Sequence, residues 1–214
     1  MTRFRSVVFD VDSTLSGIEG IDWLASQRGA EVQAWSASLT ERAMNGEIPI
    51  EAVYGERMRA VSPDRAEIEE LGRIYIDRMV DGARELFAEL REREVETVLV
   101  SGGLREAIAP LAAELGVDLR HVHAVSIYFD AEGCYSGFEE SSPMTRQNGK
   151  RLVVGAMGLK APVLAVGDGM TDSEMRSVVD AFAAFTGFTK RAPVVERADF
   201  VIENFDQLRA LILT

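Results

Sequence analysis

The chain has 214 residues, of which 47% are hydrophobic, and it carries a formal net charge of −12 at pH 7. This length and apolar content suit one sizeable domain, or a core with a modest insertion, and the charge argues against a nucleic-acid partner, which would require a basic face. Cys134 is the only cysteine, so no internal disulfide is possible. The first apolar run is too short for a signal peptide, and no run of about 18 apolar residues occurs that could form a membrane span. We therefore expect a cytoplasmic protein.

The first predicted element is a strand that ends in two acidic residues. The apolar run Ser6–Val11 predicts a buried strand, and Asp10 and Asp12 at its end would point to the same side of it. Two carboxylates at close range raise one another's pKa, so the pair is unfavourable unless a cation or a shared proton compensates. The end of this strand is therefore the first candidate functional site.

Residues 17–80 show helical patterns and no convincing strand. We expect them to form a helical cap inserted into a core made of residues 1–16 and 81–214. In the last of the four expected helices, Ser62 would be the N-cap and Pro63 the first helical residue. The four helices are predicted at Ile18–Arg28, Val32–Met44, Ile50–Arg59 and Pro63–Met79.

A second strand is predicted at Glu94–Val100, followed by Ser101-Gly102-Gly103 and a helical pattern. We expect this tripeptide to lie at the start of the helix, where free backbone N–H groups and the helix dipole favour an anion. Further along, the residues from 125 to 140 alternate in polarity around a central Glu-Gly, which predicts a small β-hairpin.

The last third of the chain contains one more candidate cation and two more acidic residues near a predicted strand end. Lys150 would lie just inside a helix, as a compact cation able to neutralise phosphate. A third strand, Pro162–Val166, is followed by "GDGMTD", which contains Asp168 and Asp172. Repeated strand–turn–helix units predict an α/β fold with a doubly wound, mainly parallel sheet. The remaining elements are strands at Ala181–Phe185 and Phe200–Ile202 and a helix at Phe205–Leu213.

The acidic residues at the strand ends predict a metal site. Ligands bind to open α/β sheets at the carboxyl ends of the strands, so these side chains should converge. All the available ligands are oxygens, while the histidines and the cysteine lie in another segment, so Mg²⁺ fits better than zinc. Mg²⁺ usually shares its coordination sphere with a phosphate, and a carboxylate beside it can act as a nucleophile. Spacing alone does not tell which of Asp10 and Asp12 would attack.

Four motifs, "FDVDST", "SGG", "GK" and "GDGMTD", together resemble those of the haloacid dehalogenase-like phosphatases, in the expected order and across almost the whole chain. Stretches such as "DSTLSGIEGIDWLA" and "YSGFEESSPMTRQNGK" are similar to the phosphoserine phosphatase family in particular. The resemblance implies a Rossmann-like core with a helical cap. It also implies Mg²⁺-dependent hydrolysis of L-phosphoserine, through an aspartyl-phosphate, as the last step of serine synthesis.

The resemblance also implies a role for each residue of the motifs. Asp10 would be the nucleophile, and Asp12 would protonate the leaving alkoxide and later activate water. Mg²⁺ would be held by Asp10, by Asp168 and by the backbone carbonyl of Asp12, with Asp172 nearby or acting through water. The phosphoryl oxygens would be bound by Ser101, Gly102, Lys150 and Thr171.

A zwitterionic substrate such as phosphoserine needs a carboxylate for its ammonium and a guanidinium for its carboxylate. Glu19 and Arg57 match the family's residues for these two roles, and the planar Arg can bind a carboxylate bidentately. Met44 matches a pocket-lining Met of the family, and Ile50 lies where the family often has a Phe.

Two alternatives stay open from the sequence. The same chemistry could serve another small phosphomonoester or transfer the phosphoryl group to an acceptor alcohol. A signalling receiver domain also phosphorylates an Asp in an α/β sheet, although the long insertion argues against it. The sequence is compatible with a monomer or a homodimer.

Overall fold

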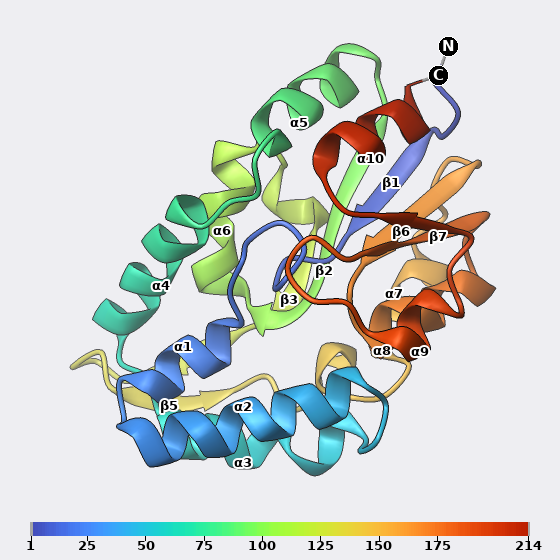
Figure 1. The fold of residues 1–214 in the computed structure, drawn as a ribbon. Coiled ribbons are helices and arrows are strands. Elements are labelled where there is room, and N and C mark those ends of the chain that lie inside the picture. The colour runs from blue at the N-terminus through green and yellow to red at the C-terminus, as the bar shows by residue number, and fades with distance from the viewer. Residues whose placement is uncertain (1, 214) are drawn as a thin grey trace.

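Six apolar segments form a parallel sheet in the order β3-β2-β1-β6-β7-β8 in the computed structural model, which describes residues 2–213 (Figure 1). Every residue of β1, β6 and β7 is buried, because helices cover both faces of the sheet. The predicted fold class is confirmed. The strands are β1 Ser6–Phe9, β2 Glu96–Leu104, β3 Val122–Val125, β6 Val163–Gly167, β7 Ala181–Phe185 and β8 Phe200–Ile202.

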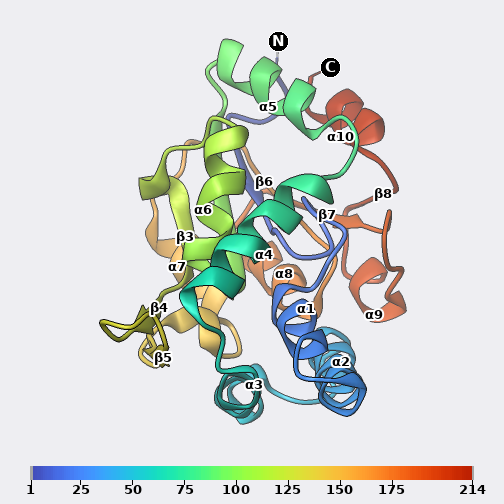
Figure 2. The same cartoon turned by 90° about the vertical axis from the view of Figure 1, so that its left-hand side faces the viewer.

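Helices pack on the sheet in two layers, as Figures 1 and 2 show. One face carries α5 (Ala83–Glu92), α6 (Arg105–Glu114) and α10 (Phe205–Ile212), and the other carries α7 (Gly149–Ala156) and α8 (Met170–Ser173). This division follows from right-handed crossovers, since the chain first moves from β1 toward β3 and then reverses toward β8. The point of reversal, between β1 and β6, is where ligands bind in such sheets.

Three helices lie together at the carboxyl ends of the strands: α1 (Gly20–Ser26), α2 (Ala30–Met44) and α3 (Tyr54–Val61) (Figure 1). The fourth helix of the expected cap, α4 (Arg65–Asp77), instead packs along α6. Gly72 allows this close approach, because a Cβ there would lie 3.1 Å from the Pro110 side chain. The boundary of the cap at residues 17–80 stays a prediction.

Two expected helix starts were wrong. Ser62 ends α3 in a left-handed conformation (φ 32°), and Asp64 is the N-cap of α4 in a reciprocal capping box with Glu67. The tripeptide Ser101-Gly102-Gly103 lies inside β2, and α6 begins only at Arg105. Its backbone groups therefore belong to the end of a strand and not to the dipole of a helix.

The predicted hairpin is present as the antiparallel pair β4 (Ile127–Phe129) and β5 (Tyr135–Phe138). The edge strand β3 was not among the predicted strands. No helix within residues 2–213 combines the length and the apolar content that crossing a membrane requires. The shorter helical segments are η1 Ile50–Ala52, η2 Leu119–His121, η3 Pro143–Thr145, η4 Glu174–Ser177 and α9 Ala192–Val195.

Candidate active site

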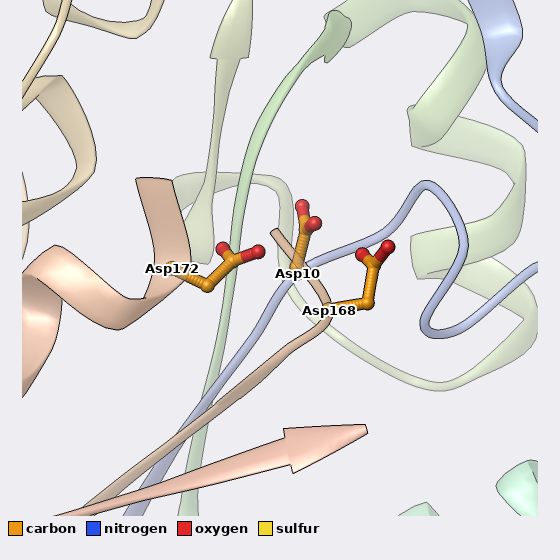
Figure 3. A group of neighbouring side chains, drawn as sticks. All are labelled: Asp10, Asp168 and Asp172. Carbon is orange, nitrogen blue, oxygen red and sulfur yellow. The ribbon is translucent and has the colours of Figure 1, made fainter. Parts of the chain in front are cut away.

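Three buried carboxylates gather at the point where the sheet reverses direction. Asp10 follows β1, Asp168 follows β6, and Asp172 lies in α8; one oxygen from each lies within 4.8 Å of the others (Figure 3). The strand register explains the convergence, because Phe9 pairs with Val166 and the next residues of both strands continue to the same edge. The predicted cluster thus forms from segments far apart in the chain.

Lys150 links two of these acids. Its Nζ lies 2.7 Å from Oδ1 of Asp10 and 2.7 Å from Oδ1 of Asp172, and its side chain is only 7% exposed. Burial lowers the pKa of Lys150, but the two carboxylates outweigh burial and raise it above its usual value. The lysine is therefore a fixed positive charge, held at the start of α7 as predicted.

Asp168 is held by two side chains that the sequence did not indicate. Buried Arg191 forms an ion pair with its Oδ2, and the Thr14 hydroxyl donates to its Oδ1 at 3.3 Å. Burial raises the pKa of Asp168 to about 7, although Arg191 acts in the opposite direction. The pKa of Asp10 is also raised, by burial and by the charge of Asp172.

The carboxylate of Asp12 lies outside this cluster and accepts three hydrogen bonds. Oδ1 accepts from the backbone N–H of Gly20 at 2.7 Å and from the hydroxyl of Tyr75 at 2.7 Å. Oδ2 accepts from the hydroxyl of Ser101 at 3.1 Å. Burial raises the pKa of Asp12 while these hydrogen bonds lower it. Asp12 is thus separate from the three acids that could share a cation.

The end of β2 lies against Asp12. The hydroxyl of Ser101 also accepts from the N–H of Gly103 at 2.9 Å, and the carbonyl of Gly102 accepts from the hydroxyl of Tyr54 at 2.8 Å. A Cβ at position 103 would lie 2.7 Å from Oδ2 of Asp12, so the close approach requires glycine.

A pocket with an empty volume of about 750 Å³, counted to its open mouth, lies between these groups and the cap helices. It is lined by every predicted site residue except Ser101 and Asp172. The hydroxyl of Thr171 is buried without a hydrogen-bond partner among the described residues. A buried polar atom that lines a pocket in this way is suited to bind a ligand oxygen.

Glu19 and Arg57 line the same pocket from the cap. Glu19 is the N-cap residue of α1, where Oε1 accepts from the hydroxyl of Ser13 at 2.7 Å, and burial raises its pKa to about 8. Arg57 is buried in α3 and donates to Asp22 at 2.8 Å and to the hydroxyl of Ser36 at 3.1 Å. These two bonds use part of a guanidinium that has five N–H donors, so others are available to a ligand.

The residues present fit a divalent metal ion. The cluster offers three carboxylates against two fixed cations, Lys150 and Arg191, and two of its acids have raised pKa values because they are crowded and buried. An ion with oxygen ligands would relieve this excess of negative charge. The side chain of Asp12 does not belong to the group, so the metal role predicted for Asp12 could come only from its backbone carbonyl.

Sequence reasoning missed the side chains that hold the predicted residues in place. Three such side chains are distant in sequence from the predicted residues that they bind. The pairs are Tyr54 with Gly102, Tyr75 with Asp12 and Asp22 with Arg57. Arg146 lines the pocket mouth as an exposed cation, and it was not singled out. No motif spacing marks any of these residues; only the charge of Arg146 beside the "GK" motif could have drawn attention.

Comparison with known proteins agrees with this geometry. The family model for haloacid dehalogenase-like hydrolases matches residues 7–177, and the chain therefore belongs to this family. Phosphoserine phosphatase of Rattus norvegicus is 36% identical over 206 residues, which cover 95% of this chain and 91% of the rat protein. The resemblance to phosphoserine phosphatases and the expectation of a phosphomonoester hydrolase are confirmed.

Two solved structures have the same fold over nearly the whole chain. A phosphoserine phosphohydrolase-like protein from Francisella tularensis aligns with a TM-score of 0.89 and 25% identity, covering 98% of this chain and all of the other. A phospho-aspartyl intermediate analogue of phosphoserine phosphatase aligns with a TM-score of 0.81 and 27% identity, covering 97% and 98%.

Proposed function

We propose that the protein hydrolyses L-phosphoserine to L-serine and phosphate, the last step of serine synthesis by the phosphorylated route. The observation that carries this proposal is the presence of Glu19 and Arg57 in the pocket that also contains Asp10 and Lys150. One pair matches the ammonium and carboxylate of an amino acid, and the other matches a phosphoryl group. The relatives named as phosphoserine phosphatases support the same substrate.

In the first half of the reaction, a carboxylate oxygen of Asp10 attacks phosphorus and the bond from phosphorus to the serine oxygen breaks. Lys150 lies against Asp10 and balances charge on the phosphoryl oxygens. Thr171 donates to these oxygens from the wall of the pocket, and the Ser101 hydroxyl turns from Asp12 to donate to them as well. Asp12, whose pKa burial raises, gives its proton to the leaving serine oxygen.

In the second half, Asp12 takes a proton from water as the water oxygen attacks phosphorus. The bond between phosphorus and Asp10 breaks, which releases phosphate and restores both carboxyl groups. Mg²⁺ would be held by Asp10, Asp168 and Asp172 with the backbone carbonyl of Asp12, and when bound it supplies positive charge to the phosphoryl group.

Phosphoryl transfer to an acceptor alcohol, or turnover of another small phosphomonoester, is the alternative within the same chemistry. A Mg²⁺-dependent phosphate-release screen across amino-acid, sugar and nucleotide monophosphates tests the proposal. We expect L-phosphoserine to give the highest kcat/KM. Equal turnover of sugar phosphates would show that Glu19 and Arg57 do not form a clamp for the amino acid.

Replacing Arg57 by lysine should raise KM for L-phosphoserine by about 10- to 100-fold, with a smaller change in kcat. Hydrogen bonds to charged groups contribute about 1.5–3 kcal/mol, and the single ammonium of lysine cannot bind a substrate carboxylate bidentately, as a planar guanidinium can. Steady-state kinetics measure the effect, and Arg59→Lys, exposed on the same helix, is the matched control. An unchanged KM in Arg57→Lys would contradict the carboxylate contact.

Mg²⁺ should raise Tm, and more at pH 8 than at pH 5.5. Burial raises the pKa of Asp168 to about 7, so this candidate ligand keeps its proton as the pH rises from acid toward neutral in the metal-free protein. Mg²⁺ must displace that proton, so its affinity increases with pH. At 100 times Kd, binding adds about 2.7 kcal/mol.

Differential scanning fluorimetry measures this shift, with the exposed variant Glu203→Gln as control. Asp168→Asn should lose most of the shift while the control keeps it. An identical Mg²⁺ response in Asp168→Asn and in the unmodified protein would place the ion elsewhere.

A further inference from the structure

Tyr54 connects the cap to strand β2, which holds two of the predicted phosphate-binding residues, Ser101 and Gly102. It begins α3, its side chain is 4% exposed, and its ring lies 5.3 Å from that of Phe138 in the hairpin. Its hydroxyl donates to the carbonyl oxygen of Gly102 at 2.8 Å, across 48 positions of sequence. Burial raises the pKa of Tyr54, so its hydroxyl stays protonated and can donate.

This hydrogen bond acts on one end of a rigid peptide unit. The carbonyl of Gly102 and the N–H of Gly103 belong to the same planar peptide and point in opposite directions. On the other side, the N–H of Gly103 donates to the hydroxyl oxygen of Ser101 at 2.9 Å. Tyr54 and Ser101 therefore fix the orientation of this peptide from its two ends.

The backbone here does not fix the peptide by itself. Glycine occupies both sides of it and has the widest backbone freedom of any residue. The pairing of β2 with β3 is irregular between Val100 and Leu104, so no regular ladder holds this segment. The tyrosine hydroxyl thus supplies an orientation that two glycines would otherwise lack.

The orientation matters because the N–H of Gly103 sets the direction of the Ser101 hydroxyl. That oxygen accepts from Gly103, so its own proton must point away, and it donates at 3.1 Å to Asp12, which lines the pocket. We propose that Tyr54 is a positioning residue that holds the Ser101–Gly102–Gly103 backbone, and with it the Ser101 hydroxyl, in the form that binds a phosphoryl group. This rests on the proposed function only in placing the phosphoryl group at Ser101.

The hydrogen bond between Tyr54 and Gly102 would also couple the position of the cap to phosphate binding. If the Tyr54 hydrogen bond exists only when α3 lies on β2, then a closed cap raises affinity for phosphate, and phosphate favours the closed cap to the same degree. Tyr54 and Arg57 lie one turn apart on α3, so one helix would carry contacts to both ends of the substrate.

The test is Tyr54→Phe, which removes only the hydroxyl. We expect Kd for inorganic phosphate, measured by calorimetry with Mg²⁺ present, to rise about fivefold, which corresponds to one hydrogen bond. We expect kcat/KM to fall by a similar factor for L-phosphoserine and also for methyl phosphate, which lacks the amino-acid group. Tyr128→Phe, the same change at an exposed hairpin site, is the control.

Each outcome has one meaning. A lower Tm with unchanged phosphate affinity and unchanged kcat/KM would make Tyr54 a packing residue only and overturn the proposal. A loss confined to L-phosphoserine would mean that the variant disturbs Arg57, which also overturns it. If the unmodified protein prefers a different phosphomonoester, the proposed substrate fails, but the phosphate and methyl phosphate measurements still decide the role of Tyr54.

Discussion

Replacing Asp10 by asparagine should abolish turnover, with a loss in kcat of at least about 10⁴-fold. An amide is a far weaker nucleophile than a carboxylate, so no aspartyl-phosphate can form at position 10. The fold should persist, because the variant removes one of three crowded carboxylates and Lys150 keeps its ion pair with Asp172. We therefore expect Tm to change by only a few degrees.

Two measurements check this expectation. Phosphate release under single-turnover conditions gives the rate, and mass spectrometry after acid quench detects a phosphoryl group on the protein. The unmodified enzyme should show the added mass and Asp10→Asn should not, while exposed Asp81→Asn behaves as the unmodified enzyme. Substantial turnover by Asp10→Asn, or a phosphoryl group found on another residue, would refute the assignment of the nucleophile.

Replacing Lys150 by methionine should lower kcat/KM by about 10³-fold, the upper range for removing a group that stabilises transition-state charge. Lys150 contacts Asp10 and Asp172 at 2.7 Å each, and the side chains of all three residues are almost completely buried. Methionine keeps most of the length of the side chain, but the phosphoryl group and both carboxylates lose the positive charge beside them.

The same variant should lose stability when metal-free. Removing one partner of a buried ion pair costs about 3–5 kcal/mol, because the remaining charge is buried without compensation. The loss should be greater at pH 8 than at pH 5.5, since burial raises the pKa values of Asp10 and the neighbouring Asp168, and these acids take up protons as the pH falls. Thermal denaturation measures it, with exposed Lys160→Met as control. A Lys150→Met protein with normal kcat/KM would remove the lysine from the phosphate site.

The acidic cluster could be predicted because it depends on a rule of topology. Asp10 and Asp168 each follow an apolar strand, and parallel strands bring their carboxyl ends to one edge whatever the distance between them in the chain. The identity of the nucleophile and the roles of Glu19 and Arg57 came from the family resemblance instead. These roles stay predictions.

Other features depend on contacts that spacing does not encode. Tyr54 and Tyr75 reach their partners across 48 and 63 positions, so only the packing of α3 and α4 shows them. The helix start at Asp64 was different, because Glu67 follows three residues later and forms the capping box that the sequence already contains. The prediction placed the N-cap at Ser62 because Pro63 is favoured at the first helical position, whereas the N-cap is Asp64.

The attachment of α4 to α6 has a consequence for the catalytic cycle. Tyr75 lies in α4, which packs on α6, and Tyr54 lies in α3, which precedes α4 in the chain. Ser62, in a left-handed conformation, lies between the two helices. If substrate enters by a movement of α1–α3 about that joint, Asp12 keeps its hydrogen bond from Tyr75 in every state but loses the one from Gly20 of α1. The hydrogen bond from Tyr54 to Gly102 forms only when the cap is closed. The proposed acid–base residue would then be held in part throughout the cycle, while the proposed phosphate contact would form only with the cap closed.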